Sequence, residues 1–387
     1  MRVLFASRRP AYPFFQGGAE RSFFEMAKAL AEGGHRSAIY GECRDAPERL
    51  EPFLSADGAA EEYSWLDDKD TVLGRQVPSR LALVSRPTER LESLNTFLAD
   101  FRRQLVNMAY GFRPDVICTQ LDGSSEVVEL CSFVDAHMLH FVRDTCFPFN
   151  FHVLTGVPGS PPTPICVANS RYTADFVRSE FGVESRVLYP TVPGMEPSDG
   201  ETPASADRDR RRAEGRAGRV LFVNPHRLKG GPVLYEVARR LSDVPFLVIP
   251  GWADGVPSDW RRLPNVEWRE WPVLDMGAAY RSADLAVVPT QQSEGFGRVA
   301  IEAQVCGTPV MASNNSALAE VLGDSALLVD DYRDPEAWAV AIRSALSAPD
   351  RLRRLAAAGR VNAARFAPER ICRDFEDLVR ELDEERG

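Results

Sequence analysis

The sequence predicts an α/β protein with two domains, each a parallel sheet covered by helices. Short apolar runs alternate with amphipathic segments along the 387 residues, which is the pattern of buried parallel strands and their crossover helices. This length exceeds what one hydrophobic core usually supports. A proline-rich and then strongly charged stretch at 190–218 separates two halves with the same order of strands and helices. We therefore expect two similar domains.

The first half begins as a β-α-β unit. Residues 3–7 form an apolar run, residues 21–31 have helical periodicity, and residues 35–40 return to a strand pattern. Gly33 and Gly34 mark the end of the helix. The other elements expected in this half are a weak strand at 82–84, a helix at 88–110, strands at 115–119, 140–142 and 165–169, and a helix at 172–181 capped by Ser170.

The second half repeats this order. A strand at 220–223 leads through a loop at 224–231 to a helix at 233–241 and a strand at 245–249. Apolar runs at 284–289 and 308–312 predict further buried strands. Helices are expected at 275–282, after Gly297, at 335–346, at 351–364 and at 368–384.

These patterns divide the chain into two domains and a linker. Residues 1–190 form the first domain and residues 219–367 the second, with a linker at 191–218. The C-terminal helix at 368–387 has a mixed face, so we expect it to pack back on the first domain.

Composition excludes several classes of function. The net charge of −10 disfavours nucleic acid as a general partner and gives no overall attraction to an anionic bilayer. No apolar run reaches the roughly 18 residues of a transmembrane helix, and the chain begins as a strand rather than a signal peptide. The seven cysteines are scattered without a C-x-x-C pair, which favours a cytoplasmic location and argues against a zinc site. Peripheral membrane contact and the oligomeric state stay open.

Two carboxylates flank a glycine turn where a strand is expected to become a helix. Glu294 precedes Gly295 and Gly297, and Glu302 lies on the helix that follows. That helix is apolar almost all round, so Glu302 has no obvious solvated face. One interpretation is a glutamate at the edge of the core, satisfied by an arginine or a backbone N–H group. The other is a ligand site, because ligands of such sheets bind near helix N-termini at the carboxyl ends of strands.

Three loops, at 8–20, 224–231 and 293–298, each follow a predicted strand and precede a helix. Each therefore lies at the carboxyl edge of its sheet, and the three converge if the sheets face each other across a cleft. Their glycines, cations and carboxylates suit a diphosphate and hydroxyl-rich sugars. These residues are Gly17, Gly18, Gly230, Gly231, Gly295, Gly297, Arg227, Lys229, Arg298 and Glu294, with Glu302 close by on the helix.

Two of these loops also have simpler interpretations. Gly17-Gly18 can be a tight turn, and Lys229-Gly230-Gly231 can be a solvated turn. Lys229 is notable because only three of the 46 basic residues are lysines. The chain has no Walker loop and no G-x-G-x-x-G motif, so neither an ATPase nor a simple dinucleotide enzyme is indicated.

Several motifs together resemble those of one enzyme family. The first is Glu294-x7-Glu302, followed by Ala303 and the segment 306–310. Others are the glycine loop at 16–20, the segment 167–173, and Lys229-Gly230. The chain resembles the retaining glycosyltransferases of family 4, which have the GT-B fold of two Rossmann-like domains, and the resemblance covers nearly the whole sequence.

The resemblance implies transfer of a sugar from a nucleotide-diphospho-sugar to a hydroxyl acceptor, with retention of the anomeric configuration. It implies that Glu294 holds hydroxyls of the transferred sugar, that Glu302 holds the ribose, and that Lys229 neutralises the departing diphosphate. Backbone N–H groups at the donor would come from Gly295, Phe296, Gly297 and Arg298, and Gly17 and Gly18 would close over the diphosphate. No cofactor and no metal are expected.

Two positions depart from the family pattern. The family usually has an arginine in a G-R-L context after the first strand of the second domain, where this chain has Asn224-Pro225-His226-Arg227-Leu228. Either Arg227 or His226 can take the place of that arginine. In the first domain Arg143-Asp144 stands where the family often has a histidine, so a base role there is open. Both side chains can instead contact the sugar or the acceptor.

We expect the acceptor to be a small molecule, a saccharide or a lipid-linked compound. Aromatic side chains in the first loop and after Asp144 can line its pocket, or they can belong to the core. These residues are Tyr12, Phe14, Phe15, Phe147, Phe149 and Phe151.

Two other functions stay open. A nucleotide-sugar epimerase of the same fold would need an acid/base constellation that the sequence does not display. A non-catalytic nucleotide-sugar-binding or scaffold subunit would explain the two altered positions. The intact Glu294, Glu302 and Lys229 favour the transferase.

Overall fold

The computed structural model describes residues 1–10, 17–43, 71–73, 81–87, 94–121, 124–145, 164–195, 218–251, 258–269 and 275–387. The chain divides into two compact units, Met1–Thr191 with Pro368–Gly387, and Val192–Ala367. Sequence patterns placed the end of the first domain at residue 190 and the return of the chain at residue 368. Most of the predicted linker, residues 196–217, lies outside the described residues.

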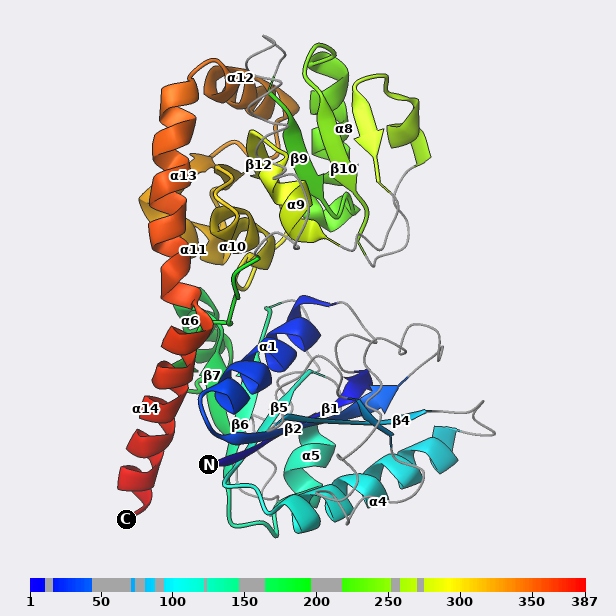
Figure 1. Ribbon diagram of the computed structural model, residues 1–387, viewed down its shortest axis with the longest axis vertical. Coiled ribbons are helices and arrows are strands. Elements are labelled where there is room, and N and C mark those ends of the chain that lie inside the picture. The colour runs from blue at the N-terminus through cyan, green and yellow to red at the C-terminus, as the bar shows by residue number, and fades with distance from the viewer. Residues whose placement is uncertain are drawn as a thin grey trace. The chain divides into compact units, whose positions relative to one another are not determined.

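The first unit contains an eight-stranded sheet with the order β3-β4-β2-β1-β5-β6-β7-β8 (Figure 1). Its strand pairs are parallel except for β3–β4, which is antiparallel and lies at the edge. The antiparallel edge pair departs from the wholly parallel sheet that we predicted. The strands are β1 (Arg2–Pro10), β2 (Arg36–Cys43), β3 (Thr71–Leu73), β4 (Leu81–Pro87), β5 (Val116–Gln120), β6 (His137–Val142), β7 (Ile165–Ala168) and β8 (Arg186–Val187).

Side chains alternate along β1 between the two faces of this sheet, as expected for a strand buried on both sides. Val3 and Phe5 pack with helices α1 (Gly18–Glu32) and α14 (Pro368–Arg386). Leu4 and Ala6 pack on the other face with α4 (Leu94–Phe112) and α5 (Ser124–Leu130). The helix α6 (Arg171–Phe181) lies beyond β7, and Ser170 caps it by accepting from the Thr173 backbone N–H at 3.1 Å.

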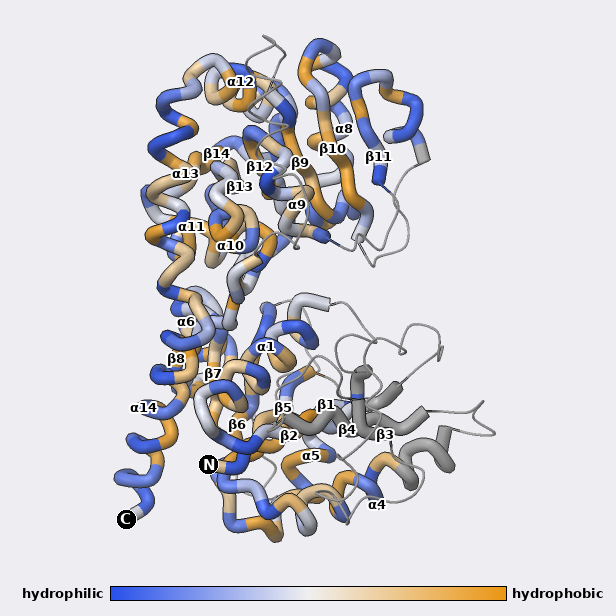
Figure 2. The backbone as a smooth tube through the Cα atoms, viewed as in Figure 1, coloured by the Kyte–Doolittle hydropathy of each residue, from blue (hydrophilic) through white to orange (hydrophobic). Residues whose placement is uncertain are grey.

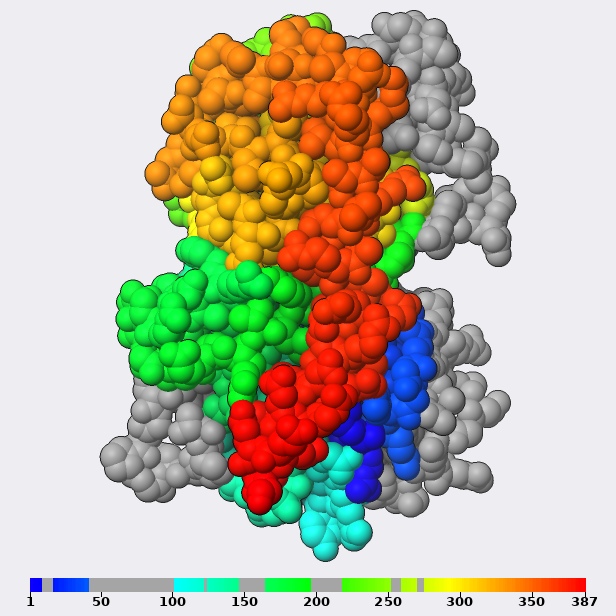
Figure 3. All heavy atoms as spheres, turned by 90° about the vertical axis from the view of Figure 1, so that its left-hand side faces the viewer, coloured from blue at the N-terminus to red at the C-terminus, as the bar shows by residue number. Residues whose placement is uncertain are grey.

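Helix α14 lies beside α1 although the two are far apart in sequence (Figure 3). Its apolar residues recur at helical spacing and are buried against the first unit. They are Ile371, Phe375, Leu378, Val379 and Leu382. The C-terminal helix is therefore part of the core of the first unit.

The second unit contains a six-stranded, fully parallel sheet with the order β11-β10-β9-β12-β13-β14. Its strands are β9 (Val220–Val223), β10 (Phe246–Ile249), β11 (Val266–Trp268), β12 (Leu285–Val288), β13 (Val310–Ser313) and β14 (Leu327–Val329). The apolar residues gather along β9 and β10 in Figure 2. Trp260 and Trp338 are fully buried in this core.

The helices of the second unit follow its strands in turn. They are the 3₁₀ turns η2 (Arg227–Lys229), η3 (Ser258–Arg262), η4 (Gly323–Ser325) and η5 (Ala364–Phe366), and the helices α8 (Gly231–Arg240), α9 (Met276–Arg281), α10 (Arg298–Val305), α11 (Ser316–Leu322), α12 (Pro335–Leu346) and α13 (Pro349–Ala363). The prediction of an α/β fold with two parallel-sheet domains is confirmed, apart from the antiparallel edge strand. Sequence patterns missed the short elements α5, α11, β11 and β14, and placed the start of α1 three residues late.

No helix among the described residues is long and apolar enough to cross a bilayer. The five described cysteines are free and buried. Burial raises the pKa of the Cys131 thiol to about 12 and that of Cys166 to about 11. These two thiols are therefore protonated and unreactive at neutral pH.

Candidate functional site

The candidate site lies at the carboxyl edge of the six-stranded sheet, where the strand order reverses. From β9 the chain adds β10 and β11 on one side, and then crosses to place β12, β13 and β14 on the other. The switch point therefore falls between the neighbouring strands β9 and β12. Ligands of open parallel sheets bind at such a switch point, outside the carboxyl ends of the strands.

Lys229 and Glu294 meet at this switch point. Lys229 follows β9, Glu294 follows β12, and the Lys229 Nζ lies 2.5 Å from Glu294 Oε2. Their side chains are 30% and 19% exposed, so both remain accessible from solvent. The loops are also joined by their backbones, because the Gln291 N–H donates to the Leu228 carbonyl at 2.9 Å. The structure thus brings together two of the predicted site residues from separate loops.

Two glycines position Lys229. Gly230 has φ +88°, and a Cβ there would lie 2.0 Å from the carbonyl oxygen of Pro289 in the β12 loop. A Cβ on Gly231 would lie 1.9 Å from the Pro225 carbonyl oxygen. Both glycines are buried, so the alternative of a solvated turn is wrong. Only glycine allows such close approach of two backbones.

The loop that carries Glu294 is held from the α11 side. The Glu294 backbone N–H donates to Ser316 Oγ at 2.8 Å, and the Ala317 N–H donates to the Glu294 carbonyl at 3.1 Å. Gly297 has φ +84° and is the N-cap of α10, and a Cβ there would lie 2.4 Å from Leu318 Cδ2. The positive φ favours glycine at this position, and an added Cβ would also have to displace the Leu318 side chain.

Glu302 is buried on α10 with a hydrogen bond to each carboxylate oxygen. Arg298 Nε donates to Oε1 at 2.8 Å, and the Tyr280 hydroxyl donates to Oε2 at 2.9 Å. The arginine partner expected for a glutamate at the edge of the core is therefore present. The second partner, Tyr280, was not indicated by sequence patterns. Both carboxylate oxygens of Glu302 therefore have a partner within the second unit.

The other predicted donor residues differ in what they can offer. The Phe296 side chain is 4% exposed and packs edge-on against Phe366, with ring centroids 5.1 Å apart. Only its backbone can therefore reach a ligand. Arg227 is exposed on η2, and the His226 Nδ1 accepts from the Leu228 backbone N–H at 3.3 Å. Arg227 is thus the more available of the two replacements for the missing arginine.

In the first unit, Gly17 and Gly18 lie at the N-terminus of α1, after β1. Gly17 is the N-cap with φ −77°, and Gly18 is the first helical residue. Among the described residues, nothing lies within 4 Å of the place where a Gly18 Cβ would be. Neither backbone strain nor packing in the described part of the chain therefore requires glycine at position 18. The tight-turn interpretation gives way to a helix start.

Arg143 lies at the same edge, anchored through Gln120. Arg143 Nε donates to Gln120 Oε1 at 2.9 Å, and Gln120 Nε2 donates to the Ala19 carbonyl at 3.1 Å. The guanidinium is over the rings of Phe23 and Phe141, 5.2 and 4.7 Å from their centroids. Sequence patterns missed Gln120. This residue reaches both Ala19 and Arg143 because β5 lies between β1 and β6 in the sheet.

The remaining predicted residues of the first unit are either partly or fully buried or lie outside the described residues. Asp144 is half-buried, and His140 is a buried strand residue of β6, as its position in an apolar run indicated. Tyr12 and Phe15, the acceptor-side candidates in the first loop, lie outside the described residues, as do Phe14, Phe147, Phe149 and Phe151.

Comparison with known proteins bears on the segment that holds Glu294 and Glu302. Residues 270–362 match the family model for glycosyl transferases group 1. This group 1 segment contains β12, α10 and β13, and therefore both glutamates of the site. Lys229 lies outside it, so its place in the site rests on the geometry described above.

Relatives and solved structures agree with this match. The chain is 34% identical over 222 residues to a D-inositol 3-phosphate glycosyltransferase of Segniliparus rotundus, covering 52% of this chain and 48% of the relative. A protein of that name from Xylanimonas cellulosilytica is 33% identical over 227 residues, 52% of each chain. This chain thus spans about half the length of these relatives.

Two solved structures match nearly the entire fold. Anabaena Alr3699/HepE in complex with UDP and glucose has a TM-score of 0.71 at 18% identity, covering 98% of this chain and 100% of that one. The sucrose-phosphate synthase of Thermosynechococcus elongatus has a TM-score of 0.73 at 19% identity, covering 99% and 100%. These similarities establish the GT-B fold that the sequence predicted.

Proposed function

We propose that this protein is a glycosyltransferase that moves a sugar from a nucleotide-diphospho-sugar to an acceptor hydroxyl with retention of the anomeric configuration. The observation that carries the proposal is the Lys229–Glu294 pair at the switch point of the second sheet. The match of residues 270–362 to glycosyl transferases group 1 supports it, as does the GT-B fold.

Lys229 and Glu294 can give up their contact with each other and bind the donor instead. A partly exposed salt bridge contributes about 0–1 kcal/mol to stability, so separating Lys229 from Glu294 costs little. Charge-assisted hydrogen bonds to phosphate and to sugar hydroxyls are stronger than neutral ones. We assign the Lys229 ammonium to the diphosphate and the Glu294 carboxylate to the sugar hydroxyls.

The surrounding groups fit the rest of a nucleotide-sugar. Helix α10 begins at the switch point, with Gly297 as an N-cap that makes no side-chain cap hydrogen bond. The first backbone N–H groups of this helix can therefore face an anion. We assign Glu302 to the ribose, Arg227 to the phosphates, and the backbone of Gly295 to Arg298 to the donor.

The rate then comes from stabilising the departing diphosphate. Charge builds on the leaving oxygen as the glycosidic bond breaks, and a fixed ammonium and aligned N–H groups favour that charge. The proposed transfer reaction uses no metal and no cofactor.

For the acceptor, the names of the relatives suggest a phosphorylated cyclitol. Arg143 and Asp144 are proposed as acceptor-side residues.

A panel of nucleotides tests the donor site directly. We expect one of UDP, GDP, ADP and TDP, or one of their sugar conjugates, to raise the melting temperature of the full chain. At a ligand concentration 100 times Kd, the stabilisation amounts to about 2.7 kcal/mol. Transfer is then assayed with that donor and inositol 3-phosphate, other polyols and saccharides as acceptors.

The panel also separates the rival functions. No stabilisation by any nucleotide would refute the donor site. Binding without transfer or slow donor hydrolysis would favour a binding subunit over an enzyme. Conversion of the donor sugar to an epimer would favour an epimerase.

Exchanging Gly18 for alanine tests whether the first-unit glycine loop approaches the donor. We expect Gly18→Ala to leave the melting temperature unchanged or slightly raised, because the described surroundings have room for the methyl group and alanine favours helix. We expect kcat/KM for transfer to fall at least tenfold, since the methyl group would keep the diphosphate away. Wild-type kinetics with wild-type stability would remove Gly18 from the site.

A further inference from the structure

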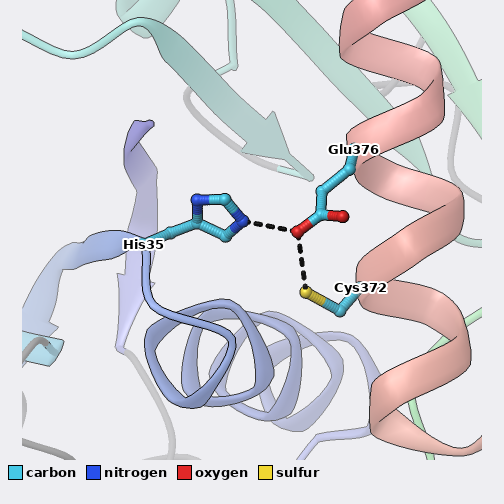
Figure 4. A group of neighbouring side chains, drawn as sticks. All are labelled: His35, Cys372 and Glu376. Carbon is cyan, nitrogen blue, oxygen red and sulfur yellow. Dashed lines mark hydrogen bonds and ion pairs between the residues drawn. The ribbon is translucent and has the colours of Figure 1, made fainter.

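The corner between α1 and β2 brings a histidine against the last helix of the chain. His35 follows α1, and its backbone N–H donates to the Leu30 carbonyl at 3.0 Å. Cys372 and Glu376 are four residues apart on α14, so they share one face of that helix. Figure 4 shows the three side chains directed toward one another. His35 Nε2 lies 2.7 Å from Glu376 Oε1, and Cys372 Sγ lies 3.8 Å from that same oxygen.

These three side chains lie close enough together to hold one metal ion. Their ligand atoms, one nitrogen, one sulfur and one oxygen, all lie within 4.8 Å of one another. A tetrahedral ion with bonds of about 2.0–2.3 Å holds its ligand atoms about 3.3–3.8 Å apart. The sulfur–oxygen distance of 3.8 Å agrees with this range, whereas the nitrogen–oxygen distance of 2.7 Å has to lengthen when the ion binds. Cys372 is buried, whereas the His35 and Glu376 side chains are 16% and 35% exposed. An ion can therefore enter from solvent and keep a water molecule as a ligand.

We propose that His35, Cys372 and Glu376 bind a single Zn²⁺ ion, with water in the fourth position. Mixed nitrogen, sulfur and oxygen ligands suit zinc, whereas Mg²⁺ and Ca²⁺ prefer oxygen alone. The site belongs to the first unit and is separate from the switch point of the second sheet. The proposal departs from our expectation of no metal, which followed from the family resemblance and from cysteines scattered without a C-x-x-C pair.

Binding of the ion requires the Cys372 thiol and the His35 ring nitrogen Nε2 to give up their protons. Burial, reinforced by the nearby Glu376 carboxylate, raises the pKa of the Cys372 thiol to about 11, so the metal-free thiol is protonated. The ion takes the thiolate, the Nε2 lone pair and a carboxylate oxygen, and it replaces the His35–Glu376 hydrogen bond. The thiol proton goes to solvent, and the ring proton of His35 moves from Nε2 to Nδ1, so that the neutral ring presents its Nε2 lone pair to the ion.

The ion would fasten α14 to the α1–β2 corner. A contact between residues so far apart in sequence closes a long loop, which favours a metal clip. The same helix makes a second histidine–carboxylate pair, His137 Nε2 to Asp383 Oδ1 at 2.7 Å. This pair belongs to no cluster of three ligands among the described residues. It is therefore a matched control for His35 and Glu376.

Cobalt serves as the spectroscopic probe in the full-length protein after metal has been removed with a chelator. We expect one equivalent of Co²⁺ to produce a thiolate-to-cobalt charge-transfer band, and Zn²⁺ to displace it. Cys372→Ser should abolish the band. His35→Gln and Glu376→Gln should each weaken binding at least tenfold, while His137→Gln should leave it unchanged. Circular dichroism checks that each variant is folded.

A second measurement needs no variant. Zn²⁺ should protect Cys372 of the wild-type protein from alkylation under partly denaturing conditions, as read by peptide mass spectrometry. Absence of the cobalt band in the folded wild type, or a band that survives Cys372→Ser, would overturn the proposal. So would equal losses in His35→Gln and His137→Gln, because the pairs would then act only as contacts that hold the helix.

Discussion

Replacing Glu294 with glutamine, or Lys229 with methionine, is expected to lower the rate of sugar transfer by about a hundredfold to a thousandfold. This is the usual cost of removing one group that stabilises charge in a transition state. Both variants keep the size of the side chain and remove the charge. Initial rates of transfer and of donor hydrolysis measure the effect, and nucleotide affinity separates binding from chemistry.

Stability should hardly change in these variants. The pair is partly exposed, so its loss costs about 0–1 kcal/mol. A matched control is the exposed Arg343–Asp243 pair of the same unit, whose two contacts are each 2.9 Å. Arg343→Met should leave activity at the wild-type level. If both site variants hydrolyse donor like the wild type, the roles assigned to Lys229 and Glu294 are wrong.

The double variant tests whether the two residues act together. Groups that stabilise one transition state are not additive. We therefore expect Lys229→Met with Glu294→Gln to lose less than the product of the two single losses. Single losses that multiply in the double variant would mean that Lys229 and Glu294 act independently.

Much of the fold could be predicted because buried parallel strands have a strong local signal. Strand β9 matches its predicted range, and helix α12 begins at Pro335, a residue favoured in the first turn. Short elements such as α5 and α11 were missed, because seven residues give too little periodicity. The start of α1 was missed for a different reason. Glycine has poor helix propensity, yet Gly18 begins that helix.

The candidate site was predictable where its residues lie close together in sequence. Glu294, Gly297 and Glu302 fall within one turn and helix, so their shared position followed from the pattern alone. Tyr280 as a partner of Glu302 did not, because a hydroxyl on another helix leaves no local signal. The proximity of Cys372 to His35 also leaves no local signal, because it arises only when α14 returns to the first unit.

Replacing Gly230 with alanine is expected to destabilise the second unit by at least ~3 kcal/mol. A non-glycine residue at φ +88° is strained, which costs roughly 1–3 kcal/mol. The added Cβ would also lie 2.0 Å from the Pro289 carbonyl oxygen, so β12 and its loop would have to move. Chemical denaturation, followed by the fluorescence of the tryptophans buried in that unit, measures the change.

Gly18→Ala is the matched control for this substitution, since both replace a glycine at a helix N-terminus. Gly18 has neither a positive φ nor a close neighbour among the described residues, so the two variants separate backbone constraint from the general effect of adding a methyl group. Gly230→Ala should also weaken nucleotide binding, because Lys229 precedes the strained residue and moves with it. A variant that unfolds like the wild type would mean that the loop tolerates a side chain and that glycine is not needed to place Lys229 beside Glu294.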